Sequence, residues 1–98
     1  MNKERILHVL KEQKGLLQKQ FHVKRIGLFG SFARNEATDK SDIDLIVEFD
    51  APLSVYIRNR YLLGDHLKQL FKRDIDLANP DSLKPFYRTE ILEQAVYA

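Results

Sequence analysis

The amino-acid sequence predicts a small α/β (α+β) protein in which a mixed sheet of about three strands is flanked by helices. Two long segments, 3–20 and 54–72, have apolar residues at the spacing of an amphipathic helix. Short apolar runs lie between these segments and after the second one. The clearest run alternates apolar and polar side chains over residues 42–49. The length of 98 residues fits one domain, 1–98, with room for one core and a minimal site.

The first expected helix covers residues 3–20. Its apolar residues recur on one side, with lysine and glutamine at the other positions. Asn2 is the expected N-cap, and Gly15 weakens the middle of the helix by up to about 1 kcal/mol. The residues expected to face the core are Ile6, Leu7, Leu10 and Leu17.

A strand and a tight turn are expected next. Residues 23–29 are apolar and β-prone, and the run stops at Gly30. A short helix is then expected over residues 31–37, with Ser31 as its N-cap. The polar stretch 38–41 has the composition of a loop.

The most regular strand pattern covers residues 42–49 and ends before Pro52. A second long helix is expected over 54–72, with Ser54 as its N-cap. On the strand, one face is expected to hold Ile43, Leu45, Val47 and Phe49, and the other Asp42, Asp44, Ile46 and Glu48. On the helix, the residues expected to point inward are Ile57, Tyr61, Leu63, Leu67, Leu70 and Phe71.

The chain is expected to end with a short strand over 74–78 and a helix over 83–95, with Pro85 in its first turn. The strands at 42–49 and 74–78 are joined by a long crossover helix, so they are expected to be parallel. The connection between 23–29 and 42–49 is too short to decide, and either direction remains open.

Composition excludes several classes of protein. The chain has no cysteine, which rules out disulfide scaffolds, thiolate metal sites and a cysteine nucleophile. No apolar run is long enough to span a bilayer, and no signal peptide precedes the first helix. The expected location is therefore the cytoplasm, with no membrane partner.

The net charge of +2 hides an uneven distribution. Residues 1–25 hold seven Lys and Arg against two acidic residues, whereas residues 36–50 hold six acidic residues against one lysine. The basic segment is either the solvated face of a helix or a docking surface for phosphate or an acidic protein. The acidic block is harder to explain without a ligand, because crowded carboxylates repel one another unless a cation neutralises them.

The acidic residues have the spacing of a metal site. Asp42 and Asp44 are two residues apart on an expected strand, so both point to one face, and Asp74 and Asp76 repeat this spacing. Carboxylate oxygens bind Mg²⁺, and two Mg²⁺ ions can clamp the attacking and leaving oxygens of a phosphoryl transfer. The alternative is a strand of solvated aspartates at the surface.

A phosphate-binding turn precedes these aspartates. Gly30 allows the backbone to approach a ligand closely, and Ser31 places a hydroxyl at the expected helix start, where phosphate is favoured. An isolated Gly-Ser turn is common, but its fixed distance from an Asp-x-Asp pair is rare at background frequencies. Together they describe a nucleoside triphosphate bound with Mg²⁺.

Gly30-Ser31, followed after ten residues by Asp42-Ile43-Asp44, resembles the signature of the DNA polymerase β-like nucleotidyltransferase superfamily. The wider sequence resembles the minimal nucleotidyltransferases, which are small antitoxin partners of HEPN ribonuclease toxins. The resemblance covers essentially the whole chain and is carried by segments 27–37, 41–49, 76–85 and 91–96.

The resemblance implies roles for individual residues. Asp42 and Asp44 would bind two Mg²⁺ ions, and Asp76 would be the third carboxylate, which also helps to activate the attacking hydroxyl. Gly30 and Ser31 would hold the triphosphate of ATP.

Three further positions are less settled by the resemblance. Arg34 would contact phosphate or would be a solvated helix residue. Asn35 stands where the family has glycine, which puts the shape of the turn in question. Asp74 would have a structural or electrostatic role.

The activity implied is transfer of AMP from ATP to a tyrosine of a HEPN toxin, which silences the toxin. Two alternatives stay open: a non-catalytic antitoxin that neutralises its toxin by occlusion, and nucleotidyl transfer to a small hydroxyl compound. Nucleic acid is not expected as a direct substrate, because basic and aromatic residues are not interleaved along the chain.

Overall fold

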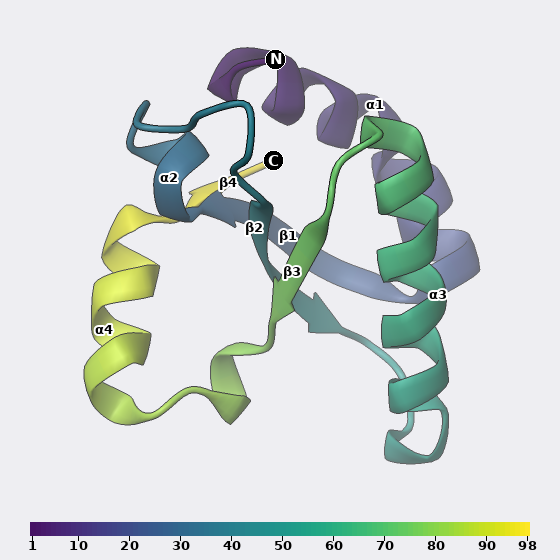
Figure 1. The fold of residues 1–98 in the computed structure, drawn as a ribbon. Helices are drawn as coiled ribbons and strands as arrows, with labels where there is room; N and C mark the ends of the chain where they lie inside the picture. Colours follow the sequence, from purple (N-terminus) through teal and green to yellow (C-terminus); the bar gives the residue numbers. More distant parts are fainter.

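A four-stranded mixed sheet in the order β3-β2-β1-β4 organises the computed structural model, which describes residues 1–98 (Figure 1). The strands are β1 (Val23–Phe29), β2 (Ile43–Phe49), β3 (Ile75–Ala78) and β4 (Val96–Tyr97). The helices are α1 (Lys3–Phe21), α2 (Gly30–Ala33), α3 (Leu53–Phe71) and α4 (Pro85–Gln94), and a 3₁₀ turn, η1, covers Pro80–Ser82.

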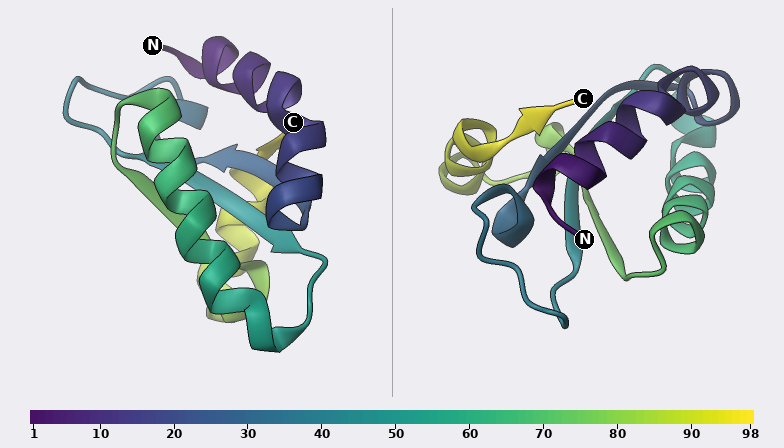
Figure 2. Two further views of the ribbon diagram at one scale, coloured as in Figure 1. Left: turned by 90° about the vertical axis from the view of Figure 1, so that its right-hand side faces the viewer. Right: turned by 90° about the horizontal axis from the view of Figure 1, so that it is seen from above.

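The core lies on one face of the sheet. Helices α1 and α3 cover this face, and α4 lies on the opposite side (Figure 2). The alternation expected for β2 explains the arrangement, because its odd-numbered apolar residues enter the core while Asp44 and Glu48 point to the other face. The fully buried side chains of this core are Ile6, Leu10, Leu17, Leu28, Ile43, Leu45, Val47, Leu63 and Leu67. Ile46 is also fully buried but lies outside this cluster.

Helix α1 forms as expected and is continuous through Gly15. The side chain of Asn2 caps it by accepting a hydrogen bond of 2.9 Å from the backbone N–H of Arg5. At the other end, His22 has the left-handed conformation that ends helices. A single helical glycine that meets no neighbour is tolerated because the apolar face on either side remains packed.

The short helix differs from the expected one. The expectation was a helix over 31–37 capped by Ser31, but α2 has four residues, begins at Gly30 and has no side-chain cap. The chain leaves the helix at Asn35, whose positive φ of 59° is incompatible with continuing it.

Helix α3 also lacks the serine cap expected at Ser54, because it begins one residue earlier, after Pro52. Its packing face was predicted in part: Leu63, Leu67 and Phe71 are buried, and Leu70 is exposed. The expectation was wrong for Ile57 and Tyr61, which are 79% and 73% exposed. Both line a groove beside β3, which is the edge strand, so no further strand covers them.

The strand directions place the functional segments. Strands β2 and β3 are parallel, as the crossover helix predicted. Strands β1 and β2 are antiparallel, which settles the direction that the sequence left open. The two-residue strand β4 pairs with β1 and was not expected, since so short a segment has no periodicity to detect. None of the helices has the length and apolar character required to cross a bilayer.

Truncation of the central core should destabilise the protein strongly. Leu45→Ala removes a fully buried side chain from the middle strand, so we expect the free energy of unfolding to fall by about 2–5 kcal/mol in urea denaturation. Leu53→Ala is the matched control, because Leu53 is 87% exposed. Equal losses for the two variants would contradict this description of the core.

Candidate functional site

The antiparallel pairing of β1 and β2 joins the Gly-Ser turn to the aspartates. Phe29, the last residue of β1, lies opposite Asp44 in this pairing, so Gly30 follows directly beside Asp44. The two parts of the motif, which ten residues separate in the sequence, therefore meet at one end of the central strand pair. The spacing of these two parts in the sequence suggested that they act together, and the fold brings them into contact.

Gly30 packs so closely against Asp44 that a side chain at this position would force the carboxylate to shift. A Cβ atom at this position would lie 2.9 Å from Cγ of Asp44 and closer still to its Oδ2. The φ angle of Gly30 is +73°, a left-handed conformation that residues with a side chain rarely adopt. Glycine is thus required here for two independent reasons, backbone conformation and the close approach of a carboxylate.

The parallel pairing of β2 and β3 brings two carboxylates together. Asp44 and Asp76 are partners in the register, so their side chains leave neighbouring strands on the same face. The pKa of Asp44 is raised from 3.8 to about 6. Burial is the largest cause, the charges of Asp76 and Asp42 follow, and Arg34 acts in the opposite direction. The site therefore concentrates negative charge with no cation of the chain sufficient to balance it.

Asp42 lies just before β2, and its side chain is exposed, as is that of Asp76. Its charge reaches Asp44, but the three carboxylates do not form a ready-made cluster that could hold a metal ion. Neither exposed side chain forms an ion pair, and Asp76 shares a side-chain hydrogen bond with Asp44. The donor set fits Mg²⁺, which binds carboxylate oxygens and keeps waters and phosphates in its shell.

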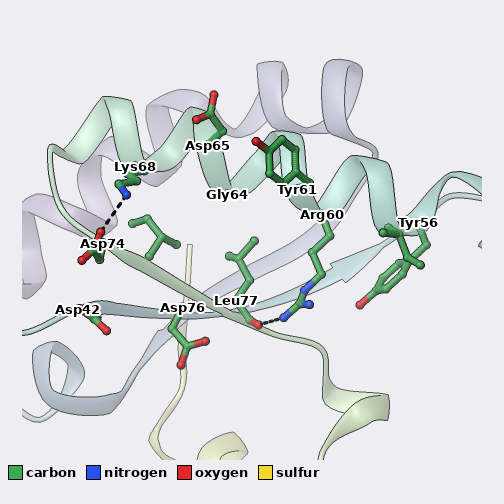
Figure 3. A pocket seen from close by; sticks show the side chains of 12 residues that line it. Asp42, Tyr56, Arg60, Tyr61, Gly64, Asp65, Lys68, Asp74, Asp76 and Leu77 are labelled. Carbon is green, nitrogen blue, oxygen red and sulfur yellow. Dashed lines mark hydrogen bonds and ion pairs between the residues drawn. The ribbon is translucent and has the colours of Figure 1, made fainter.

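Asp74 belongs to a different environment from Asp76. Its Oδ1 lies 3.1 Å from Nζ of Lys68 on α3, and its backbone oxygen accepts a hydrogen bond of 2.9 Å from the N–H of Ile43. Figure 3 shows Asp74 turned toward Lys68, whereas Asp76 leaves the strand on the other side. Alternation alone placed both aspartates on one face, and the structure separates them.

The residues around the turn are placed as follows. Ser31 is half-buried, and its hydroxyl has no hydrogen-bond partner in the chain. Arg34 donates from Nε to Glu36 Oε2 at 2.9 Å and from Nη1 to Gln94 Oε1 at 3.1 Å. Asn35 holds the left-handed conformation that glycine would hold there, so the turn keeps its shape.

A groove of about 740 Å³ lies beside the site, between α3 and the free edge of β3. Three aspartates line it on the strand side, Asp42, Asp74 and Asp76, and Tyr61 borders it on the α3 side (Figure 3). Ile57 of α3 also lines this groove. Arg60 crosses the groove and donates a hydrogen bond to the backbone oxygen of Leu77. The sequence could not identify this groove, because the apolar residues that border it have the same helical spacing as the core.

Comparison with known proteins places this geometry in a family. The nucleotidyltransferase domain family matches residues 10–98. A Methanocaldococcus jannaschii protein with the provisional name protein adenylyltransferase MJ0128 is 38% identical over 97 residues, which cover 94% of this chain and 93% of that protein. Protein adenylyltransferase MntA of Thermococcus cleftensis is 34% identical over 95 residues, 96% of this chain and 93% of MntA.

Solved structures share the fold. One described provisionally as a minimal nucleotidyltransferase superposes with a TM-score of 0.81 at 27% identity, covering 98% of this chain and 95% of that one. A toxin–antitoxin structure with AMP-PNP superposes with a TM-score of 0.67 at 23% identity, covering 99% of this chain and 72% of that one. At this lower identity the likeness establishes the fold alone.

A side chain at the turn should be poorly tolerated. Gly30→Ala places a Cβ against Asp44 in a strained conformation, so we expect a loss of about 1–3 kcal/mol in the free energy of unfolding. Gly15→Ala is the control: its Cβ would meet nothing, and it should stabilise the protein by up to about 1 kcal/mol. An unchanged stability for Gly30→Ala, measured by urea denaturation, would contradict the close packing.

The raised pKa of Asp44 predicts how stability depends on pH without metal. Between pH 3.8 and about 6 the folded state keeps a proton that the unfolded state has released, so stability falls as pH rises through this window. Asp44→Asn should remove the fall and be more stable than the wild type above pH 7. We expect a gain of about 1 kcal/mol, below the full conversion of the shift, because solvent screens a half-exposed group. Parallel pH profiles of the thermal midpoint for the two proteins would contradict the raised pKa of Asp44.

Proposed function

Because the chain belongs to the nucleotidyltransferase domain family, we propose that it is a Mg²⁺-dependent protein adenylyltransferase. Its reaction is the transfer of AMP from ATP to a tyrosine of a partner toxin of the HEPN class, and its role is that of the antitoxin. The observation that carries the proposal is the juxtaposition of Asp44, Asp76 and Gly30, produced by the two strand pairings.

The carboxylates have a division of roles in this reaction. Asp42 and Asp44 would hold the cations, and Asp76, beside Asp44, would complete the ligand set. Bound Mg²⁺ would supply positive charge that offsets the charge of the phosphates as transfer proceeds. Asp76 accepts the proton of the tyrosine hydroxyl as its oxygen bonds to the α-phosphorus, and pyrophosphate leaves as the bond between α-phosphorus and bridging oxygen breaks.

The turn after β1 is suited to the triphosphate. Gly30 leaves the backbone exposed to close approach, and the unpartnered hydroxyl of Ser31 is free to donate to a phosphate oxygen. Arg34 lies near enough to lower the pKa of Asp44, so its guanidinium adds positive charge at the same end of the site. Its present partners, Glu36 and Gln94, are exposed or half-buried and can be exchanged for phosphate.

Two observations support a protein as the acceptor. The two relatives described above carry the name protein adenylyltransferase, one of them provisionally, and fold neighbours are described as toxin–antitoxin structures, one of them with AMP-PNP. The site is also open, with exposed Ile57 and Tyr61 bordering the adjacent groove. An enzyme for a small hydroxyl compound would need further elements to enclose its acceptor.

A second candidate function is an antitoxin that acts by occlusion without chemistry. The same open groove and exposed apolar residues fit a binding role. The carboxylate arrangement favours the enzyme, because a binding module gains nothing from a carboxylate whose pKa is raised by burial and by neighbouring carboxylates.

Transfer of labelled AMP separates these functions. The protein is incubated with ATP labelled at the α-phosphate, Mg²⁺ and the protein co-expressed from the neighbouring gene. We expect label on a tyrosine of that partner, lost by about 100-fold or more in the double variant Asp42→Ala/Asp44→Ala and in Asp76→Ala. Asp74→Ala should keep most of the transfer, because Asp74 pairs with Lys68 instead.

Three results would contradict the proposal. Neutralisation of the partner that survives Asp42→Ala/Asp44→Ala, with no label on either protein, would establish occlusion. Label on a small hydroxyl compound and none on the partner would establish the other transferase. Equal losses for Asp74→Ala and Asp76→Ala would contradict the separation of the two aspartates.

A further inference from the structure

We propose that Arg73 is a positioning residue that fixes the loop 38–41 and thereby sets the place of Asp42 in the nucleotidyl-transfer site. The significance of Asp42 rests on the proposed function, but the contacts of Arg73 do not. Arg73 lies between the end of α3 and the start of β3 and was not singled out by its sequence pattern.

One guanidinium nitrogen holds most of the loop. Nη1 of Arg73 donates to the backbone oxygens of Thr38, Asp39 and Ser41, at 3.3, 3.1 and 2.8 Å. Hydrogen bonds from a charged donor are stronger than neutral ones. The last of these oxygens belongs to the peptide unit that leads directly into Asp42, so the contact fixes where that residue leaves the loop.

The loop has little else to hold it. It carries no buried apolar side chain, and the hollow of about 760 Å³ between it and the end of α3 is lined only by polar and charged residues. Its internal contacts are local, such as the bond of 2.8 Å from the N–H of Thr38 to Oγ of Ser41. Without Arg73 the loop would therefore sample other conformations, since ordering a residue costs about 1–2 kcal/mol.

Arg73 also contacts the other half of the motif. Its guanidinium carbon lies 5.2 Å from the ring centroid of Phe32, within range of a cation–π interaction. Phe32 is buried in α2, next to Ser31. One side chain thus links the loop before Asp42 with the helix that follows Gly30, and it stands three residues before Asp76.

The test uses Arg73→Met, which keeps an apolar stem and removes the donors, and Arg73→Lys, which restores a positive donor. Lys72→Met is the matched control: it removes one charge from the adjacent position, where the side chain makes no hydrogen bond or ion pair in the structure. Three quantities are measured: hydrogen exchange of the amides of residues 38–42 without metal, affinity for Mn²⁺ by electron paramagnetic resonance, and AMP transfer to the partner.

In Arg73→Met we expect faster exchange confined to residues 38–42 and a Mn²⁺ affinity lower by about 10–100-fold, the usual effect of losing an outer support of a metal ligand. AMP transfer should fall by a similar factor, through kcat more than through KM for the partner. Arg73→Lys should recover part of each loss, and Lys72→Met should behave as the wild type.

A merely structural role gives a different result. Arg73→Met would then lower global stability while the folded protein kept wild-type Mn²⁺ affinity and loop exchange, and this would overturn the proposal. If Arg73→Met does not fold, the other two variants decide. Wild-type Mn²⁺ affinity and loop exchange in Arg73→Lys, together with a lower affinity and faster exchange in Lys72→Met, would overturn the proposal, because the positive charge alone would then be responsible. Failure of the proposed function is distinguishable, because the wild type would lack AMP transfer while loop exchange still responded to Arg73.

Discussion

The register between β2 and β3 is the constraint on which the rest of the site depends. It places Asp44 beside Asp76 on the face that the core leaves free, and the antiparallel pairing with β1 packs Gly30 against the same carboxylate. The result is a half-buried acid whose pKa rises to about 6. Such an arrangement destabilises the metal-free fold at neutral pH, so binding of a cation is the physical reason that we propose for it.

The fold accommodates Asp44 by keeping the core and the site on different faces of the sheet. Residues on one face of the central strands bury against α1 and α3, and on the other face of β2 Asp44 and Glu48 stay partly exposed while Ile46 is buried. A slip of one residue in β2 would bury the aspartates and expose Ile43 and Leu45, which makes the register strongly specified. Alternate positions of β2 thus contribute to stability and to the site.

Much of this was predictable from the sequence, where local patterns determine the outcome. The α1 helix with its Asn2 cap, the strand at Ile43–Phe49 and its parallel partner followed from periodicity and a crossover length. The strand direction of β1, the two-residue β4 and the exposure of Ile57 did not, since each depends on which element packs beside it.

The candidate site shows the same division. The spacing of the Gly-Ser turn and Asp-x-Asp predicted which segments matter, but alternation could not tell Asp74 from Asp76, and an ion pair with Lys68 separates them. Asp44 as the most perturbed acid is a consequence of burial, which the sequence does not specify.

Whether these carboxylates bind metal together with the nucleotide can be tested in crystals grown with Mn²⁺ and a non-hydrolysable ATP analogue. Anomalous scattering at the manganese edge then locates the metal. We expect manganese peaks within about 2–2.5 Å of carboxylate oxygens of Asp44 and its neighbours Asp42 and Asp76, with the triphosphate against Gly30 and Ser31. Nucleotide bound without metal at these carboxylates, or metal bound only at Asp74 in the groove beside α3, would contradict it.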